Sequence, residues 1–325
     1  MTPERKRKTL IAALVWIAAI VFCALSAAFY QKPESAPAPE ARPFAAADGK
    51  IRICFWNLKN YMDTYRYEGG RRSKGPKPES EKRLIAEFLK KADPDVLGVA
   101  EMGGLAALKE FRGLLAECGL DYPYHAISED NPEYPQCAIL SRIPIENPQT
   151  LGKGLFEYRD EMRSSPRGLT AATFTTNGLR WRFGVIHLKS RFGARKYDPE
   201  FSAFRTLECR AILRDIGQGD APPALIVGDF NDEISDAAPQ VFVRNGGFVA
   251  IAAADACAKK PSYVWDREKK PYVFDFFIAD KRLAGRLSPA ETGGINRAAS
   301  DHAPVLTELD VGRDSPNRGG NARSR

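Results

Sequence analysis

Short apolar runs rich in Val, Ile, Phe and Trp recur along most of the chain, separated by polar stretches. Runs of this length and composition predict β-strands, here at residues 51–56, 96–100, 137–140, 169–175, 181–187, 224–227, 273–279 and 305–309. Apolar residues at helical spacing predict helices over residues 79–91, 105–118 and 200–216. Helices and strands alternate less regularly than in a doubly wound protein. The pattern therefore predicts an α+β domain with two mostly antiparallel sheets packed face to face.

The beginning of the chain has a different pattern. Residues 1–9 are basic, with Arg5, Lys6, Arg7 and Lys8 against Glu4, and residues 10–30 carry no charge. At about 1.5 Å per residue, such a stretch is long enough to cross a bilayer core of roughly 30 Å. The basic flank predicts a cytoplasmic N-terminus and an exported remainder.

Two interpretations of residues 10–30 remain open. A cleaved signal peptide usually has an apolar stretch of only about 7–15 residues, so the longer run favours a transmembrane anchor with the folded domain outside the cytoplasm. The small residues Ala24-Leu25-Ser26-Ala27 could instead form a cleavage site and give a secreted protein.

The regions outside the apolar pattern set the domain boundaries. Residues 31–49 are rich in Pro and Ala, which is typical of an extended spacer. Residues 312–325 have no apolar periodicity, so we expect a disordered tail. No internal repeat or second linker interrupts residues 50–311, so we expect a single folded domain. We also expect the chain to act as a monomer.

Composition excludes some classes of protein. Six Cys and three His in 325 residues argue against a disulfide-dense scaffold or a structural zinc site. The net charge of +7 suggests an anionic partner, but residues 1–9 contribute +3 and residues 310–325 contribute +2. Residues 31–49 contribute −1, which leaves +3 for residues 50–309. Only local basic clusters can therefore indicate the substrate.

Polar residues able to bind metal or phosphate follow or interrupt the predicted strands. A single Asn or Asp at a strand end is usually a turn former, but here several strands share the feature. Carboxylates suit Mg²⁺ or Mn²⁺, and a His held by an Asp can take a proton from water. The combination predicts metal-assisted phosphoester hydrolysis by residues among Asn57, Asn60, Glu101, His187, Asp229, Asn231, Asp275, Asp301 and His302.

These residues lie in sequence blocks that resemble the endonuclease/exonuclease/phosphatase superfamily of metal-dependent phosphoesterases. The blocks are ICFWNLKN, DVLGVAEM, CAILSRIPI, SPRGLTAATF, FGVIHLKSR, LIVGDFND, YVFDFFIAD and ASDHAPV, in the order of the family. They cover nearly all of residues 50–311. The resemblance implies a four-layered α/β sandwich, two sheets flanked by helices, with the active site at one end of the sheets.

The resemblance also implies roles for individual residues. Glu101 matches the main Mg²⁺ ligand, with Asn57 beside it, and Asp301 matches a further acidic residue near the metal. His302 matches the general base, and Asp275 matches the carboxylate that orients it.

Four further positions match the part of the family site that handles phosphate and water. Asp229 and Asn231 match the pair that positions the attacking water and the phosphate. His187 matches a phosphate-contacting His, and Arg167 matches an Arg that approaches the substrate phosphate.

Two positions depart from the family pattern. Ala100 replaces the Gln that usually precedes the metal-binding Glu, which removes a supporting contact but no ligand. Lys59 replaces an acid found in the base-excision branch and argues against that subgroup. All core catalytic positions are present, so an active enzyme is expected and a non-catalytic binding module is disfavoured.

Local charge favours nucleic acid as the substrate. Residues 63–83 carry seven basic and four acidic residues beside the Asn57 strand, and Asn60 and Arg191 are further candidate substrate-binding residues. Aromatic residues interleaved with basic ones are typical of surfaces that stack on bases, and here they are Tyr65, Tyr67, Phe192 and Tyr197, near Lys189, Arg191, Arg195 and Lys196. The alternative is a phosphatase or phosphodiesterase for lipid head groups or phosphorylated small molecules. The membrane segment favours this alternative, whereas no apolar hairpin for lipid is evident in the sequence.

Overall fold

The computed structural model describes residues 48–68, 71–193, 197–217, 220–254, 260–265 and 269–312. All of these belong to one compact unit, Pro43–Arg325. In this described part, no helix is both long and apolar enough to cross a membrane. The predicted anchor and nearly all of the predicted spacer and tail lie outside the described residues, as do Arg195 and Lys196.

Two mixed sheets form the centre of the domain. The first has the strand order β17 (Glu291–Thr292), β18 (Val305–Asp310), β1 (Lys50–Tyr61), β4 (Val96–Met102), β6 (Gln136–Ser141) and β5 (Tyr124–Ile127). The second has the order β13 (Phe248–Ala250), β16 (Asp275–Asp280), β12 (Ala224–Asp229), β11 (Leu179–His187), β10 (Leu169–Thr176) and β7 (Glu146–Leu151).

Each sheet is antiparallel except at one central pair. β1 runs parallel to β4 in the first sheet, and β11 runs parallel to β12 in the second, whereas the neighbouring described pairs are antiparallel. The prediction of mostly antiparallel sheets is thus confirmed. All eight predicted strands are present. The short strands β5, β7, β13 and β17 escaped prediction because they lack a clear apolar run.

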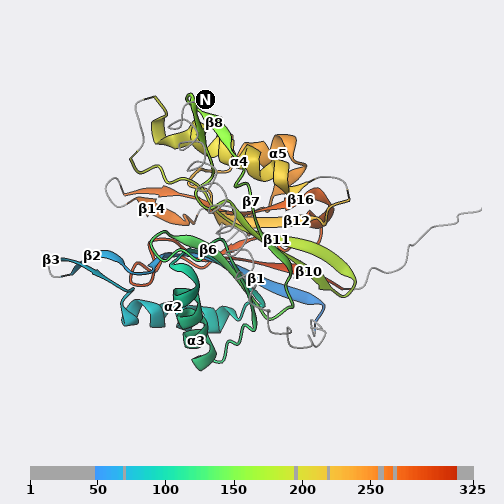
Figure 1. Ribbon diagram of the computed structural model, residues 1–325. Helices are drawn as coiled ribbons and strands as arrows, with labels where there is room; N and C mark the ends of the chain where they lie inside the picture. The colour runs from blue at the N-terminus through green and yellow to red at the C-terminus, as the bar shows by residue number, and fades with distance from the viewer. Residues whose placement is uncertain are drawn as a thin grey trace, which may run out of the picture. The chain divides into compact units, whose positions relative to one another are not determined.

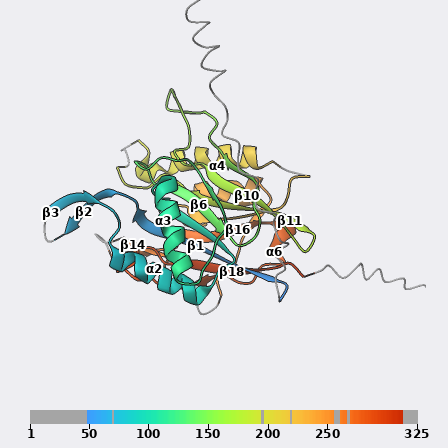
Figure 2. The same cartoon turned by 60° about the horizontal axis from the view of Figure 1, so that its bottom comes forward.

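Helices cover the outer face of each sheet. α2 (Glu79–Ala92) and α3 (Gly104–Glu117) lie against the first sheet, and α4 (Ser202–Ile216) and α5 (Ala237–Asn245) lie against the second (Figure 1). Figure 2 brings α2 and α3 forward, over β1 and β6. The predicted four-layered sandwich is confirmed. α5 was missed, and the short elements η1 (Pro199–Phe201) and α6 (Lys281–Ala284) complete the described helices.

Apolar side chains fill the spaces between these layers. Between the sheets, buried residues of both pack together, among them Phe55, Ile139, Phe183, Val185 and Val227. Separate buried clusters lie under α2 and α3 and under α4 and α5. The sheets are therefore buried on both faces, and the ends of their strands are the places where polar residues can reach solvent.

The described chain also contains hairpins that follow or precede the main strands at one end of the sandwich. They are β2 (Thr64–Glu68) with β3 (Arg71–Gly75), β8 (Phe156–Tyr158) with β9 (Glu161–Arg163), and β14 (Tyr263–Trp265) with β15 (Lys270–Tyr272). The basic segment at residues 63–83 thus consists mainly of the β2–β3 hairpin and the first turn of α2. Figure 1 shows β2–β3 and β14 projecting on the same side.

Candidate active site

Three of the predicted catalytic residues form one row across the second sheet. His187 at the end of β11 is the register partner of Asp229 at the end of β12, and Asp229 is the partner of Asp275 at the start of β16. Directly opposed residues in neighbouring strands project to the same face. Regular strand pairing therefore brings together an imidazole and two carboxylates that are far apart in the sequence.

His302 completes this row from the other sheet. It precedes β18, and its Nδ1 lies 2.8 Å from Oδ2 of Asp275. Its Nε2 lies 3.7 Å from Oδ2 of Asp229. The Asp275 hydrogen bond fixes the imidazole orientation and leaves Nε2 facing the site, which is the arrangement a general base requires.

Backbone contacts hold the His302–Asp275 pair in place. The Trp56 indole nitrogen donates to the His302 carbonyl at 2.9 Å, and the His302 N–H donates to Ser300 Oγ at 3.1 Å. Ser262 Oγ accepts the N–H groups of both Phe274 and Asp275 at 2.9 Å. The first two bonds fix His302 just before β18, and the other two fix Asp275 at the start of β16.

Asn57 bridges the two carboxylates that face each other across the sheets. Its Nδ2 donates to Oε1 of Glu101 at 3.2 Å and to Oδ2 of Asp229 at 3.1 Å. Its Oδ1 accepts the N–H of Lys59 at 3.0 Å. One amide thus holds the predicted metal ligand of the first sheet beside the predicted water-positioning carboxylate of the second.

Glu101 reaches this position through irregular backbone. It has a φ of 63°, and the β1–β4 and β4–β6 registers both shift around it. The turn that faces it also contains left-handed residues, Lys59 with φ 48° and Asn60 with φ 55°. The Asn60 N–H donates to Oε2 of Glu101 at 2.7 Å. Such conformations are costly for residues other than glycine and concentrate at functional sites.

Arg66 of β2 supports that turn from behind. Its guanidinium donates to the carbonyls of Asn60 at 2.5 Å, Met62 at 3.2 Å and Pro76 at 3.1 Å. The same turn whose N–H groups hold Asn57 and Glu101 therefore has its carbonyls bound by a cation. The β2–β3 hairpin is tied to the metal-ligand side of the site through this residue.

Electrostatics single out the same residues. Burial raises the pKa of Asp229 to about 6, despite the attraction of His302. Burial and the charge of Asp301 raise the pKa of Glu101. Burial alone would lower the pKa of His302, but Asp275 and Asp229 raise it to about 10. Burial and the nearby Arg167 lower the pKa of His187 well below its ordinary value.

A pocket of about 250 Å³ exposes these groups to solvent. Seven of the predicted site residues line it together with residues that the sequence did not single out as catalytic: the full lining is Glu101, Tyr134, Pro135, Arg167, His187, Lys189, Ser190, Asp229, Asn231, Tyr263, Phe274, Asp301 and His302. Larger cavities, of about 280, 320, 410 and 470 Å³, lie elsewhere in the described part of the chain and lack this combination of His, Asp and Asn. Tyr134 and Tyr263 carried no sequence signal because each lies outside the predicted strands.

Asn231 and Arg167 are oriented by backbone contacts. Asn231 has a φ of 51°, its N–H donates to Oδ1 of Asp229 at 2.9 Å, and its Nδ2 donates to the Leu188 carbonyl at 3.1 Å. Arg167 donates to the carbonyls of His187 at 2.6 Å and Leu188 at 2.9 Å. Both side chains therefore lie at the pocket wall, and the carbonyls at the end of β11 hold the Arg167 guanidinium.

Two predicted substrate-binding residues do not line the pocket. The Arg191 guanidinium is held by Glu200 at 2.7 Å, Asp232 at 3.1 Å and Asp236 at 3.2 Å. This arrangement gives the expected substrate contact of Arg191 no support, because its donors already face protein carboxylates. Asn60 contributes its backbone N–H to Glu101 and its carbonyl to Arg66.

The residues present suit a divalent cation. Glu101 and Asp229 share one amide donor, and burial raises the pKa of both carboxyl groups, so a bound cation would stabilise their charged forms. Asp229, Asp275 and His302 also bring one donor atom each within 4.8 Å of one another. His302 and Asp275 already bind each other, whereas Glu101 and Asp301 line the same pocket and offer carboxylate oxygens, the ligands that Mg²⁺ and Mn²⁺ prefer. The Oδ1 of Asn57, the third predicted ligand, instead accepts the Lys59 N–H.

Comparison with solved structures shows the same fold. The human Nocturnin catalytic domain with bound sulfate is 19% identical, with a TM-score of 0.56 over 82% of this chain and 95% of that chain. An AP endonuclease from Archaeoglobus fulgidus is 15% identical, with a TM-score of 0.55 over 80% and 100%. A mannosyl-6-phosphatase from Bacteroides thetaiotaomicron is 17% identical, with a TM-score of 0.54 over 80% and 99%.

Sequence comparison gives the family. No curated protein matches the chain. The sequence model of the Endonuclease/Exonuclease/phosphatase family matches residues 54–302, which include every predicted site residue from Asn57 to His302. The matched region covers most of the 325 residues. The chain therefore belongs to the endonuclease/exonuclease/phosphatase family, whose members hydrolyse phosphoester bonds.

Proposed function

We propose that this protein is a divalent-metal-dependent phosphodiesterase that hydrolyses nucleic acid, with Mg²⁺ or Mn²⁺ as its cofactor. The observation that carries the proposal is the His302–Asp275 pair at 2.8 Å, facing carboxylates that Asn57 bridges in the same pocket. A base oriented by a carboxylate beside a cluster of oxygen ligands is suited to activate water next to a metal-bound phosphate.

The proposed reaction uses these residues in distinct roles. His302 Nε2 takes a proton from a water whose oxygen forms the new bond to phosphorus. The phosphorus–oxygen ester bond breaks, the leaving oxygen takes a proton from solvent, and His302 releases its proton to solvent. Asn231 and Asp229 position the water and the phosphate. His187 and Arg167 donate to phosphate oxygens as negative charge develops. Glu101, Asn57 and Asp301 would hold a divalent cation, which would supply positive charge against the phosphate when bound.

The proposal includes a location. The basic flank and the uncharged residues 10–30 support a single membrane anchor with the catalytic domain, residues 50–311, outside the cytoplasm. Secretion after signal cleavage is the alternative. We further propose that the Pro- and Ala-rich residues 31–49 act as a spacer and that the enzyme is a monomer.

A phosphorylated small molecule is the second candidate substrate. One of the structural neighbours is a mannosyl-6-phosphatase, and a pocket of about 250 Å³ is large enough for a single phosphate group with part of its leaving group. Lipid head groups belong to the same alternative. The structure also reveals an exposed apolar residue, Met162, on the β8–β9 hairpin, with Leu155 just before it, which the sequence had not indicated.

Substrate profiling of the full-length protein in detergent tests the proposal. We expect cleavage of single-stranded DNA or RNA and of bis-p-nitrophenyl phosphate with Mg²⁺ or Mn²⁺, and no cleavage after EDTA treatment. Activity that survives chelation would refute the metal dependence. Hydrolysis of sugar phosphates or sphingomyelin, with no cleavage of polynucleotides, would replace nucleic acid as the substrate class.

A further inference from the structure

Large apolar side chains are exposed at only one end of the described sandwich. They lie on segments that adjoin the site ends of the strands: Tyr65, Leu105, Tyr134, Leu155, Met162, Phe192, Tyr197 and Val273. Apolar residues scattered over a surface need no explanation, but a concentration around an active site indicates an interaction surface. Half of these residues are aromatic.

Three of the exposed tyrosines are paired with an arginine. The Arg72 guanidinium lies 4.1 Å from the ring centre of Tyr65, and that of Arg159 lies 3.6 Å from the ring centre of Tyr197. In the catalytic pocket, the Arg167 guanidinium lies 5.5 Å from the ring centre of Tyr134. Tyr65 and Tyr197 remain 59% and 56% exposed, so much of each ring is accessible to a ligand.

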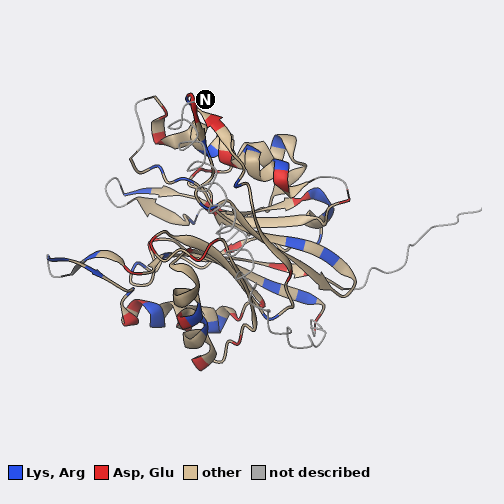
Figure 3. Cartoon of the chain, in the orientation of Figure 1, with Lys and Arg blue, Asp and Glu red and all other residues tan. Residues whose placement is uncertain are grey.

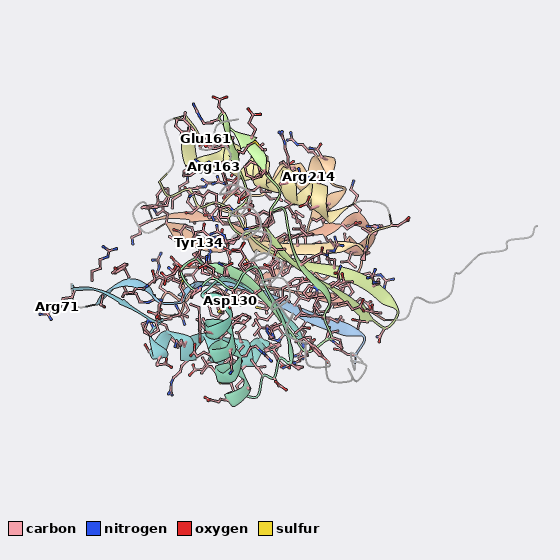
Figure 4. The ribbon with its side chains drawn as sticks, viewed as in Figure 1. Arg71, Asp130, Tyr134, Glu161, Arg163 and Arg214 are labelled. Atoms are coloured by element: carbon pink, nitrogen blue, oxygen red, sulfur yellow. The ribbon has the colours of Figure 1, made fainter. Side chains whose placement is uncertain are left out.

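An ion pair connects the first of these pairs with the second. Lys74, the cross-strand partner of Tyr65, forms an ion pair with Glu133 at 3.3 Å, and Glu133 precedes Tyr134. Figure 4 shows Tyr134 between Arg71, at the tip of the β2–β3 hairpin, and Arg163 of the β8–β9 hairpin. Tyr134 also lines the catalytic pocket, so the path from the β2–β3 hairpin reaches this pocket.

The other half of the path leaves the pocket along the segment after β11. Lys189 lines the catalytic pocket, Phe192 is 80% exposed, and Tyr197 lines a second pocket of about 280 Å³ beside the β8–β9 hairpin. Lys189 and Tyr197 are close enough in sequence that the chain limits their separation to less than about 30 Å. The second pocket is lined by Tyr158, Arg159, Glu161, Arg163 and Tyr197, a combination suited to a planar, polar ring.

Charge favours an anionic occupant. In the described part of the chain, Arg71, Arg72 and Arg159 form no ion pair with a carboxylate, whereas Arg163 is paired with Glu161. Figure 3 shows basic residues along the projecting β2–β3 hairpin. Alternating aromatic rings and arginines are how proteins bind single-stranded nucleic acid, since bases stack on the rings and phosphates contact the cations.

A lipid surface fits these observations less well. Leu155 and Met162 adjoin one hairpin, β8–β9, whereas the other exposed aliphatic residues, Leu105 and Val273, lie on separate segments, so no single hairpin gathers them all. The catalytic pocket between them is lined mainly by polar and aromatic residues, with no apolar channel for an acyl chain.

We propose that the three tyrosine–arginine pairs, Tyr65–Arg72, Tyr134–Arg167 and Tyr197–Arg159, bind a single-stranded polynucleotide that crosses the catalytic pocket and is held on both sides of it. Because the strand extends in both directions from the reacting phosphate, internal phosphodiester bonds are cut. This inference rests on the proposed phosphodiesterase function and adds the form of the substrate and the position of cleavage.

Strand binding can be measured separately from catalysis. Fluorescence anisotropy of a labelled single-stranded oligonucleotide, with full-length protein in detergent and EDTA, gives the affinity of Tyr65→Ala/Arg72→Ala and Tyr197→Ala/Arg159→Ala. We expect each double variant to bind at least about tenfold more weakly, since a base–aromatic stack and a phosphate contact are lost together. The salt slope of log affinity should fall by about 0.7 for each arginine removed.

Matched controls separate this effect from general loss of charge or fold. Arg180→Ala/Arg214→Ala removes two exposed arginines away from the path and should bind as the wild type does. Tyr65→Phe and Tyr197→Phe keep the rings and should retain affinity. All variants should cleave bis-p-nitrophenyl phosphate within twofold of the wild-type rate, because this small substrate does not reach the hairpins.

The position of cleavage is tested with a single-stranded circular DNA, which has no ends. The wild type should linearise it with Mg²⁺ or Mn²⁺, and both double variants should do so at least about tenfold more slowly. If the wild type degrades linear oligonucleotides but leaves the circular DNA intact, the strand does not cross the pocket with support on both sides. Unchanged oligonucleotide affinity in both double variants would overturn the tyrosine–arginine assignment. The assignment would also fail if the double variants bound phosphatidylserine vesicles more weakly than the wild type but bound the oligonucleotide equally well. If the wild type does not cleave bis-p-nitrophenyl phosphate, the proposed function is refuted. The anisotropy measurement would then still decide whether the tyrosine–arginine pairs bind a single strand.

Discussion

The two sheets bring residues to the site in different ways. In the second sheet, His187, Asp229 and Asp275 are aligned by uninterrupted pairing of β11, β12 and β16. In the first sheet, Glu101 lies where the register shifts and takes a φ of 63°, opposite the left-handed turn of Lys59 and Asn60. One sheet uses regular hydrogen-bonded geometry, and the other uses a distortion.

This difference has consequences for function. A row of residues in register is fixed by many backbone bonds and should tolerate the loss of any single supporting side chain. A distorted turn persists only while its surroundings enforce it, so the first sheet should depend on individual contacts such as Arg66. We therefore expect the metal-ligand side to be the more easily perturbed half of the site.

The largest effect is expected where the two sheets meet. His302→Ala removes the proposed base, and the rate of cleavage should fall by about 10²–10⁴-fold because proton transfer contributes that much. Asp275→Asn keeps the imidazole but removes the charge that orients it, so the cleavage rate should decrease less in this variant than in His302→Ala. Steady-state kinetics with bis-p-nitrophenyl phosphate measures both. An unchanged rate for His302→Ala, in protein with wild-type circular dichroism, would exclude it as the base.

A smaller effect is expected from the support of the distorted turn. Arg66→Met removes the donors that bind the carbonyls of Asn60 and Met62, so Glu101 should be held less firmly. Supporting contacts around a metal site typically contribute about 10–100-fold in metal affinity. The Mg²⁺ concentration for half-maximal activity should rise by this amount, while the rate at saturating Mg²⁺ changes less.

Arg71→Met is the matched control for this experiment, since Arg71 lies on the same hairpin and has no contact with the turn. Its Mg²⁺ dependence should equal that of the wild type when a small substrate is used. Equal Mg²⁺ dependence in Arg66→Met and Arg71→Met would show that the turn holds its shape without Arg66.

The smallest effect is expected in the regular half. Ser262→Ala leaves the buried N–H groups of Phe274 and Asp275 without their acceptor, which should lower the free energy of unfolding by about 1–3 kcal/mol. Activity should fall little, because strand pairing still places Asp275. Urea unfolding followed by fluorescence measures the change, with the exposed Ser73→Ala as control. A loss of activity as large as that of Asp275→Asn would contradict the idea that register alone fixes this row.

The sequence predicted the main strands and the polar residues at their ends because long apolar runs identify buried strands directly. It was less informative about the hairpins. Residues 64–68 and 71–75 flank Gly69-Gly70, a recognised hairpin signal, but their high charge concealed the strand pattern. The sequence suggested that Arg191 binds substrate. In the structure its guanidinium instead forms ion pairs with Glu200, Asp232 and Asp236, which are distant from it along the chain or carry no sequence signal of this role.

The sequence by itself determined the layers of the fold, the family and the residue types available for catalysis, because periodicity and motifs are local properties of the chain. Only the tertiary structure decided which residues meet. The pairing of His302 with Asp275, the bridge of Asn57 between Glu101 and Asp229, and the position of Glu101 at a register shift all depend on contacts between segments distant in sequence. Strand register and backbone distortion are set by the packing of the whole sandwich, and no local pattern encodes them.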